Sequence, residues 1–409
     1  MIRPARLIAL MCAAEVLAMM GISSFAALLP ELASEWQLTN TDAGWIGGFY
    51  FAGYVVAVPL LTSLTDRVDA RLVFLSGAVI GGVGAAGFGL LADGFWSAAF
   101  WRVLTGIGLA GTYMPGLKAL NDRLKGQAQS RAVAFYTASF GIGMSLSYLI
   151  AGEVARLIDW RAAFVAAGAC SVLAFALAAV VLGGHEAEPP GRPDTHLLDF
   201  RPVFRNHEAM AYVLGYAAHV WELFGLRAWI VAFLVFSASV QSDPNVWLAP
   251  TVVATIFMLV GTPASIFGNE LALKYGRRRV IAVIMVVCAL YGTLLGFSGR
   301  LDYSVVVVMS LVYAALLMGD SASLTAGMVE AAEPAYRGAT MAVHSTIGFV
   351  GAAAAPPVFG LILDLAGGRG QASAWGFAFI SLGAVALLGP LALTLGVRAA
   401  KQRMAGVDR

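Results

Sequence analysis

The sequence of 409 residues is too apolar for an ordinary soluble protein, because hydrophobic residues make up 59% of it, charged residues only 12%, and the mean hydropathy is +0.80. Soluble domains average about 25% charged residues. The formal net charge of +2 gives no reason to expect nucleic acid as a partner. The composition therefore indicates an integral membrane protein in contact with the lipid bilayer.

Apolar stretches follow one another along the whole chain, and each is close to the roughly 20 residues that a helix needs to cross a bilayer. The alternation of apolar and polar residues that membrane strands require is absent. We therefore expect an all-α membrane protein with 12 transmembrane helices. The predicted spans are approximately 7–29, 42–63, 72–92, 96–117, 132–155, 162–182, 210–238, 246–268, 280–298, 303–323, 339–362 and 374–396.

The Lys and Arg residues predict the orientation of these spans, since basic residues collect in cytoplasmic loops. If the N-terminus is cytoplasmic, the outer loops contain only Arg156, Arg161, Arg300 and Arg369. We read the first apolar stretch as an uncleaved helix, because it is too long for a signal peptide and contains Glu15. These patterns predict a multi-pass protein of a bacterial inner membrane with both termini cytoplasmic. We expect it to be a monomer.

A charged and proline-rich interruption divides the chain into two halves. We expect a first six-helix bundle at 1–183, a cytoplasmic linker at 184–208 and a second bundle at 209–409. The halves resemble one another, since "AAEVLAMMGISS" (13–24) aligns with "AAHVWELFGLRA" (217–228) in register. Such internal repeats are typical of secondary transporters, whose binding sites lie near the bilayer midplane.

The loops after the second and eighth spans, "LTDRVDAR" and "KYGRR", resemble two copies of the loop signature of the major facilitator superfamily. "RVLTGIGLA" (102–110) is similar to the helix 4 pattern of that family. The resemblance implies two pseudo-symmetric bundles and a network of charges at a cytoplasmic gate. It departs at Asp69, where the signature has glycine, and at Leu273, where the second copy would have an acid. The expected gate residues are Asp66, Arg67, Arg71, Arg277, Arg278, Asp320 and His344.

Ionisable side chains at membrane depth are costly, at about 2.5 to 3.5 kcal/mol each, and are functional candidates by default. Helix 7 carries three of them, in "GYAAHVWELFGLRAWIV" (215–231). Because Glu222 and Arg227 lie about 140° apart on a helix, we expect each to use a partner elsewhere. The resemblance implies that Glu15 pairs with Arg102. The predicted substrate and proton pathway comprises Glu15, Arg102, His219, Glu222 and Arg227, with Tyr50, Tyr54, Tyr113, Tyr216 and Trp229 as aromatic walls.

Other chemistries find no support in the sequence. "GVGAAG" (82–87) and "GIGLAG" (106–111) satisfy a dinucleotide fingerprint but fall within membrane spans, where small residues let helices pack closely. No zinc H-E-x-x-H motif or P-loop is present. We expect neither a cofactor nor a metal site, and no enzymatic activity.

The leading hypothesis is a secondary transporter that moves a small polar or anionic solute by alternating access, coupled to protons. In the predicted helix 7 of this chain, the segment "AHVWEL" (218–223) is loosely similar to nitrate and cyanate permeases, although Ala218 stands where a glycine would be. Two alternatives stay open. One is a proton-coupled multidrug efflux antiporter, and the other is a membrane assembly factor or sensor that does not transport.

Overall fold

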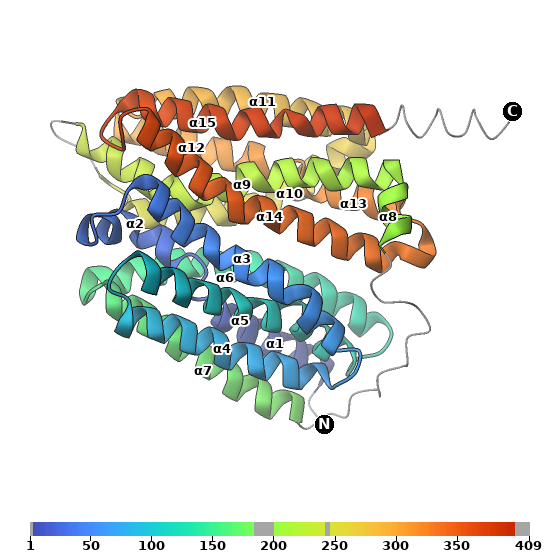
Figure 1. Cartoon of the computed structure of the whole chain (residues 1–409). Coiled ribbons are helices and arrows are strands. Elements are labelled where there is room, and N and C mark those ends of the chain that lie inside the picture. Colours follow the sequence, from blue (N-terminus) through green and yellow to red (C-terminus); the bar gives the residue numbers. More distant parts are fainter. Residues whose placement is uncertain (1–2, 184–199, 242–245, 397–409) are drawn as a thin grey trace, which may run out of the picture. The chain divides into compact units, whose positions relative to one another are not determined.

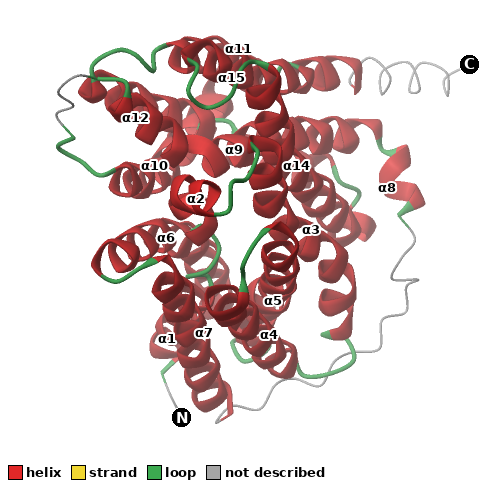
Figure 2. Cartoon of the chain, turned by 60° about the vertical axis from the view of Figure 1, so that its left-hand side comes forward, coloured by secondary structure: helices red, strands yellow, loops and turns green. Residues whose placement is uncertain are grey.

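The computed structural model describes residues 3–183, 200–241 and 246–396, and these ranges contain helices but no strands (Figure 2). Ten helices in the described ranges are long and apolar enough to cross a membrane. The prediction of an all-α membrane protein is therefore confirmed. Each of the 12 predicted spans coincides with a helix or with a pair of consecutive helices.

Two predicted spans lie outside the set of ten. The span predicted at 7–29 is divided into α1 (Pro4–Ala18) and α2 (Ser24–Glu35), and the span at 96–117 is α5 (Phe95–Asn121), which includes Arg102. The other elements are α3 (Asn40–Leu64), α4 (Ala70–Leu91), α6 (Gln127–Leu157), α7 (Trp160–Gly183), α8 (Arg201–Arg205), α9 (His207–Ser239), α10 (Pro250–Tyr275), α11 (Arg277–Phe297), α12 (Tyr303–Met318), α13 (Ser321–Ala331), the short 3₁₀ helix Pro334–Tyr336, α14 (Arg337–Leu365) and α15 (Ala372–Ala386) (Figure 1).

The chain forms two compact units, which we call unit 1 and unit 2. Unit 1 comprises Met1–Leu38 and Trp45–Thr195, and unit 2 comprises Thr39–Gly44 and His196–Arg409. The predicted linker at 184–208 falls, over residues 184–199, outside the described residues. Unit 2 includes the first turn of α3, where Asn40 and Thr41 donate hydrogen bonds to the carboxylate of Asp364.

In unit 1, α4 packs against α5 and α7, while α1 packs against α6 and α7. Glycines make the α4–α5 contact possible, because a Cβ at Gly77 would meet the backbone of Gly111 at 2.7 Å. A Cβ at Gly84 would likewise meet Thr105. The two glycine-rich fingerprints therefore serve close helix packing, as the sequence predicts.

In unit 2, α9 packs against α14, α13 and α15, and α10 packs against α12. Its core near one end of α9 includes Tyr212, Ile281, Met285, Leu324 and Met328. This packing places the polar face of α9 against the segment that joins α12 to α13. Residues far apart in the sequence are thereby brought to one place.

Candidate functional site

The first membrane-spanning helix is broken in the middle, which the apolar pattern does not predict. Residues 19–23 form turns between α1 and α2, and the local sequence is "MGISS" (20–24). The Ser147 hydroxyl of α6 donates to the Met20 carbonyl at 2.7 Å and accepts from the Ser23 N–H at 3.0 Å. Serine hydroxyls compete with regular helical hydrogen bonding, and glycine weakens a helix because its backbone loses more conformational entropy. The break therefore has its own hydrogen-bond partners on a neighbouring helix.

Arg102 of α5 binds the carbonyl groups of this break. Its Nη1 donates to the Gly21 carbonyl at 3.0 Å and its Nη2 donates to the Ile22 carbonyl at 3.2 Å. The guanidinium also lies over the ring of Tyr50 at 4.4 Å, and the Arg102 side chain is 3% exposed. Among the described residues, no carboxylate lies within ion-pair distance of Arg102. The guanidinium is therefore held by backbone dipoles and an aromatic face rather than by an acid.

Glu15 lies in the same unit but contacts a hydroxyl group. It is 1% exposed on α1, and Ser139 Oγ of α6 donates a hydrogen bond to its Oε2. Its other oxygen, Oε1, is buried with no hydrogen-bond partner among the described residues. The implied Glu15–Arg102 pair is not among the ion pairs that the described residues form, so this pairing stays a prediction.

In unit 2, Glu222 of α9 also contacts a hydroxyl group. Tyr313 Oη of α12 donates to Glu222 Oε1 at 2.5 Å, and Glu222 is 2% exposed. Arg227 lies near other groups, with its guanidinium carbon 5.0 Å from the ring centre of Phe224 and Nη2 3.9 Å from Met318 Sδ. Glu222 therefore has its partner on α12, while Arg227 contacts Met318 of α12 and the Phe224 ring one turn earlier on α9. These separate contacts agree with the 140° between the two side chains.

The structure brings His219, Asp320 and His344 together in unit 2. His219 Nδ1 lies 2.8 Å from Asp320 Oδ1, and both side chains are almost fully buried. The ring of His344 stacks on Tyr216 at 3.9 Å between centroids, and Tyr216 stacks on His219 at 6.0 Å. Asp320 and His344, expected among the gate residues, therefore lie beside His219 of the predicted substrate pathway.

The predicted aromatic walls fall into different surroundings. Tyr50 and Tyr54 are each 1% exposed, and Tyr50 contacts Arg102. Tyr113 packs against Phe140 with 4.7 Å between the ring centroids. Trp229 is fully buried, donates to the Pro356 carbonyl at 3.0 Å and stacks against Phe359. It therefore belongs to the aromatic core of unit 2, and its role in a substrate pathway stays a prediction.

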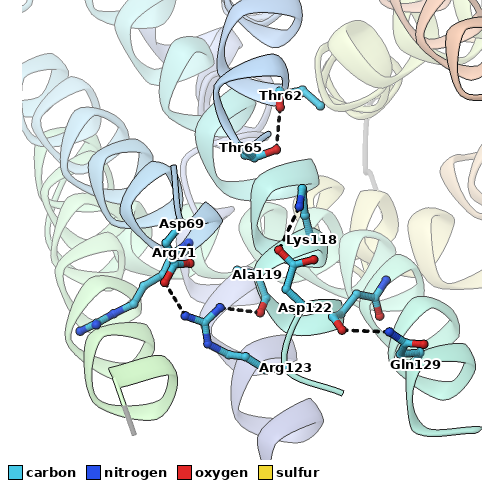
Figure 3. Close-up of polar contacts among 10 residues, drawn as sticks. Thr62, Thr65, Asp69, Arg71, Lys118, Ala119, Asp122, Arg123 and Gln129 are labelled. Carbon is cyan, nitrogen blue, oxygen red and sulfur yellow. Dashed lines mark hydrogen bonds and ion pairs between the residues drawn. The ribbon is translucent and has the colours of Figure 1, made fainter. Parts of the chain in front are cut away.

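At the predicted cytoplasmic end of unit 1, Asp69, which departs from the loop signature, accepts hydrogen bonds from two arginines (Figure 3). Asp69 caps α4 by accepting from the Arg71 N–H at 2.9 Å, and its other oxygen accepts from Arg123 Nη2 at 2.7 Å. Burial raises the pKa of Asp69, but the hydrogen bonds from Arg123 and Arg71 outweigh it and hold the pKa below its usual range. Arg67 is exposed and Asp66 is half-buried.

The other predicted gate residues contact neighbouring helices. Arg71 Nη2 donates to the Ala179 carbonyl at 2.9 Å. In unit 2, Arg277 lies 3.3 Å from Glu330, and Arg278 forms an ion pair with Glu208. Both acids lie outside the loop signature, on α13 and at the start of α9. They supply the negative charge that the second copy lacks at Leu273.

Sequence reasoning missed the partners that decide these contacts, namely Asp69, Arg123, Ser139, Ser147 and Tyr313. Asp69 had a signal, because it departs from the loop signature. The hydroxyl groups had none, since serine and tyrosine are common in membrane helices. Their importance follows from the packing of α6 on α1 and of α12 on α9.

Comparisons with known proteins identify the family. Residues 11–253 and 247–405 match the profile of the Major Facilitator Superfamily. The chain belongs to this superfamily of membrane transporters. Its two units and its all-helical fold agree with that membership.

Among sequence relatives, the human "Protein spinster homolog 1" is 24% identical over 292 residues, covering 68% of this chain and 55% of that protein. The Arabidopsis thaliana "Probable sphingolipid transporter spinster homolog 2" is 24% identical over 216 residues, covering 48% of this chain and 44% of that protein. The chain thus spans about half the length of the curated relatives that it matches.

Among solved structures, a bacterial homologue of the human lysosomal transporter Spinster matches with a TM-score of 0.75 at 16% identity, covering 96% of this chain and 95% of that chain. A transporter of the POT family matches with a TM-score of 0.78 at 15% identity, covering 98% and 99%. At these identities the likeness shows the fold.

Proposed function

We propose that the protein is a secondary active transporter that moves a small organic anion across a bacterial inner membrane by alternating access, coupled to protons. The observation that carries this proposal is the surroundings of Arg102. A buried cation without a carboxylate partner is costly, so its presence in a membrane helix favours a functional role. The carbonyls of Gly21 and Ile22 balance the positive charge of the Arg102 guanidinium only in part, and an anionic group of a solute supplies the remaining negative charge.

The two buried carboxyl groups support proton coupling. Glu15 and Glu222 each contact a hydroxyl group, from Ser139 and Tyr313. A carboxyl group beside a hydroxyl can accept or donate a hydrogen bond, so either protonation state finds a partner. Both groups are therefore suited to bind and release a proton as access to water changes. The remaining site residues keep the roles expected above, as lining and gate positions in a monomer with cytoplasmic termini.

A second candidate function is transport of an amphipathic lipid with a charged headgroup. The name of one relative supports it, since that protein is called a probable sphingolipid transporter. The same buried Arg102 would then bind the headgroup.

Thermal unfolding of the purified protein in the presence of candidate ligands separates these functions. The panel comprises small organic anions, single-chain lipids with charged headgroups, and lipophilic cations. A ligand at 100 times its dissociation constant stabilises the folded state by about 2.7 kcal/mol. We expect a small anion to raise the melting temperature of the wild-type protein and of Glu153→Gln, a variant at an exposed carboxylate, but not of Arg102→Met.

The other outcomes decide against this proposal. A shift with lipids alone, absent in Arg102→Met, favours the second candidate. A shift with lipophilic cations alone, absent in Glu15→Gln or Glu222→Gln, favours a drug antiporter. Unchanged function in cells that carry Glu222→Gln and Arg102→Met favours an assembly factor or sensor.

A further inference from the structure

The tenth membrane-spanning helix is interrupted where it carries a buried acid. α12 ends at Met318 and α13 begins at Ser321, with Gly319 and Asp320 between them. Gly319 packs closely on α10, since a Cβ at Gly268 would overlap the Gly319 carbonyl group. The regular helix is therefore interrupted at a position that packs tightly against a neighbouring helix.

Asp320 occupies the N-cap position of α13 but does not cap it. Aspartate at this position ordinarily accepts a hydrogen bond from the first-turn N–H groups of the helix. The Asp320 side chain makes no such bond. Instead, the Ala322 N–H donates to Ser265 Oγ of α10 at 3.1 Å. The Asp320 carboxylate therefore does not cap α13 and lies beside another group instead.

That group is His219 of α9, whose Nδ1 lies 2.8 Å from Asp320 Oδ1. A carboxylate beside Nδ1 favours a proton on that nitrogen, so Nε2 is the position that gains or loses the exchangeable proton. His219 is 1% exposed, and Nε2 has no hydrogen-bond partner among the described residues. Nδ1 and Asp320 Oδ1 lie within ion-pair distance but form no hydrogen bond of regular geometry. The ring therefore has an acid beside Nδ1 and a buried Nε2 that no described residue contacts by a hydrogen bond.

Other ionisable groups surround this pair, but the described residues place none besides Asp320 in ion-pair contact with His219. They come from α9, α11, α12 and α14, and each lies within electrostatic reach of His219, of Asp320 or of a group beside them. These groups are Tyr216, Glu222 and Arg227 on α9, Tyr313 on α12, His344 on α14 and Cys288 on α11.

We propose that His219 is a further proton-binding position, in addition to the carboxyl groups of Glu15 and Glu222, and that Asp320 is its positioning residue. This inference rests on the proposed function, since it assigns a site to the coupling proton in unit 2. A proton from water forms an N–H bond at Nε2 and leaves the imidazole with a charge of +1. Release returns the proton to water and the ring to neutrality.

Through Asp320, the protonation of His219 can affect the hydrogen bonds at the start of α13. While His219 is charged, the imidazolium holds the Asp320 carboxylate away from α13. When His219 is neutral, its Nδ1–H still faces Asp320 but without the positive charge, so the first-turn N–H groups of α13 compete better for the carboxylate. The acid therefore has two alternative partners, His219 and the first turn of α13, and the charge on His219 shifts the balance between them.

The test is nuclear magnetic resonance of the full chain in lipid nanodiscs, with ¹⁵N-labelled histidine, from about pH 5 to pH 9. The sequence has 5 histidines, and His219→Gln identifies the signal of interest. We expect Nε2 of His219 to change protonation state in this range while Nδ1 keeps its proton. In Asp320→Asn the imidazolium signal at about pH 6 falls several-fold, and Asp320→Glu restores it.

His207→Gln is the matched control, because His207 begins the same helix and lies outside the cluster. It leaves the His219 signals unchanged. The proposal is overturned if His219 keeps one protonation state over the whole range, or if Asp320→Asn leaves its imidazolium signal at wild-type strength. Because this measurement needs no transport, it separates the two proposals. If uptake is driven by protons but the His219 signals do not change with pH, only this inference is overturned. If the His219 signals change with pH but uptake is not driven by protons, the proposed function is overturned.

Discussion

Replacement of Arg102 by methionine tests whether the arginine holds the break in the first membrane-spanning helix. Methionine fills similar space but donates no hydrogen bond. The variant loses two charge-assisted bonds, to the Gly21 and Ile22 carbonyls, each worth about 1.5 to 3 kcal/mol. It also loses a cation–π contact with Tyr50 worth about 1 to 2 kcal/mol. Against these losses, it no longer buries a charge, which saves about 2.5 to 3.5 kcal/mol.

The net effect is a destabilisation of about 3 kcal/mol, which corresponds to a fall in melting temperature of roughly 6 to 12 °C for a unit of this size. Thermal unfolding of the purified protein, followed by circular dichroism, measures it. Arg156→Met is the control, because Arg156 pairs with Glu153 at an exposed position and contributes at most about 1 kcal/mol. If Arg102→Met unfolds at the wild-type temperature, the carbonyl contacts do not hold the break.

Three further predictions concern other contacts. Asp69→Ala should destabilise unit 1 by about 1 to 2 kcal/mol, and Asp69→Asn should be intermediate because it keeps the cap. Since the pKa of Asp69 is lowered, its stabilising contribution is present above the usual carboxyl pKa of about 3.9 and is lost as the pH falls through the lower folded-state pKa. Equal stability of wild type and Asp69→Ala against chemical denaturation at neutral pH would contradict this. Tyr313→Phe removes the hydroxyl group on Glu222, so we expect proton-driven uptake to fall by about tenfold without loss of folded protein; unaltered uptake would show that the contact is not used. Gly268→Ala should cost about 1 to 3 kcal/mol because its Cβ overlaps the Gly319 carbonyl, while Gly338→Ala, with open space around it, should not destabilise the protein, and unfolding temperatures compare the two.

The membrane spans could be predicted because hydropathy is a local property. Every predicted span falls on a helix, and the main differences lie at the ends and at two interruptions. The interruptions at 19–23 and at Gly319–Asp320 were not predictable in this way. They depend on groups from other helices, such as Ser147 and Arg102, that replace the missing helical hydrogen bonds.

The candidate site could be predicted in part for a related reason. Buried charges such as Glu222 and His219 stand out in an apolar sequence, so their positions were visible. Their partners were not, because Tyr313 and Asp320 come from a segment about 90 to 100 residues further along, which only the packed fold brings near. The same applies to Ser139, which donates a hydrogen bond to Glu15 from a helix more than 120 positions further along the chain.

Proton movement in proteoliposomes is the most direct test of proton-coupled anion transport. The lumen contains a pH-sensitive dye, and an anion that raises the melting temperature is added outside. We predict that the anion causes proton movement across the membrane in the wild-type protein and in Glu153→Gln, and that this movement disappears in Glu222→Gln while the anion still binds. Anion uptake without proton movement, unaffected when an ionophore removes the pH gradient, would contradict the account.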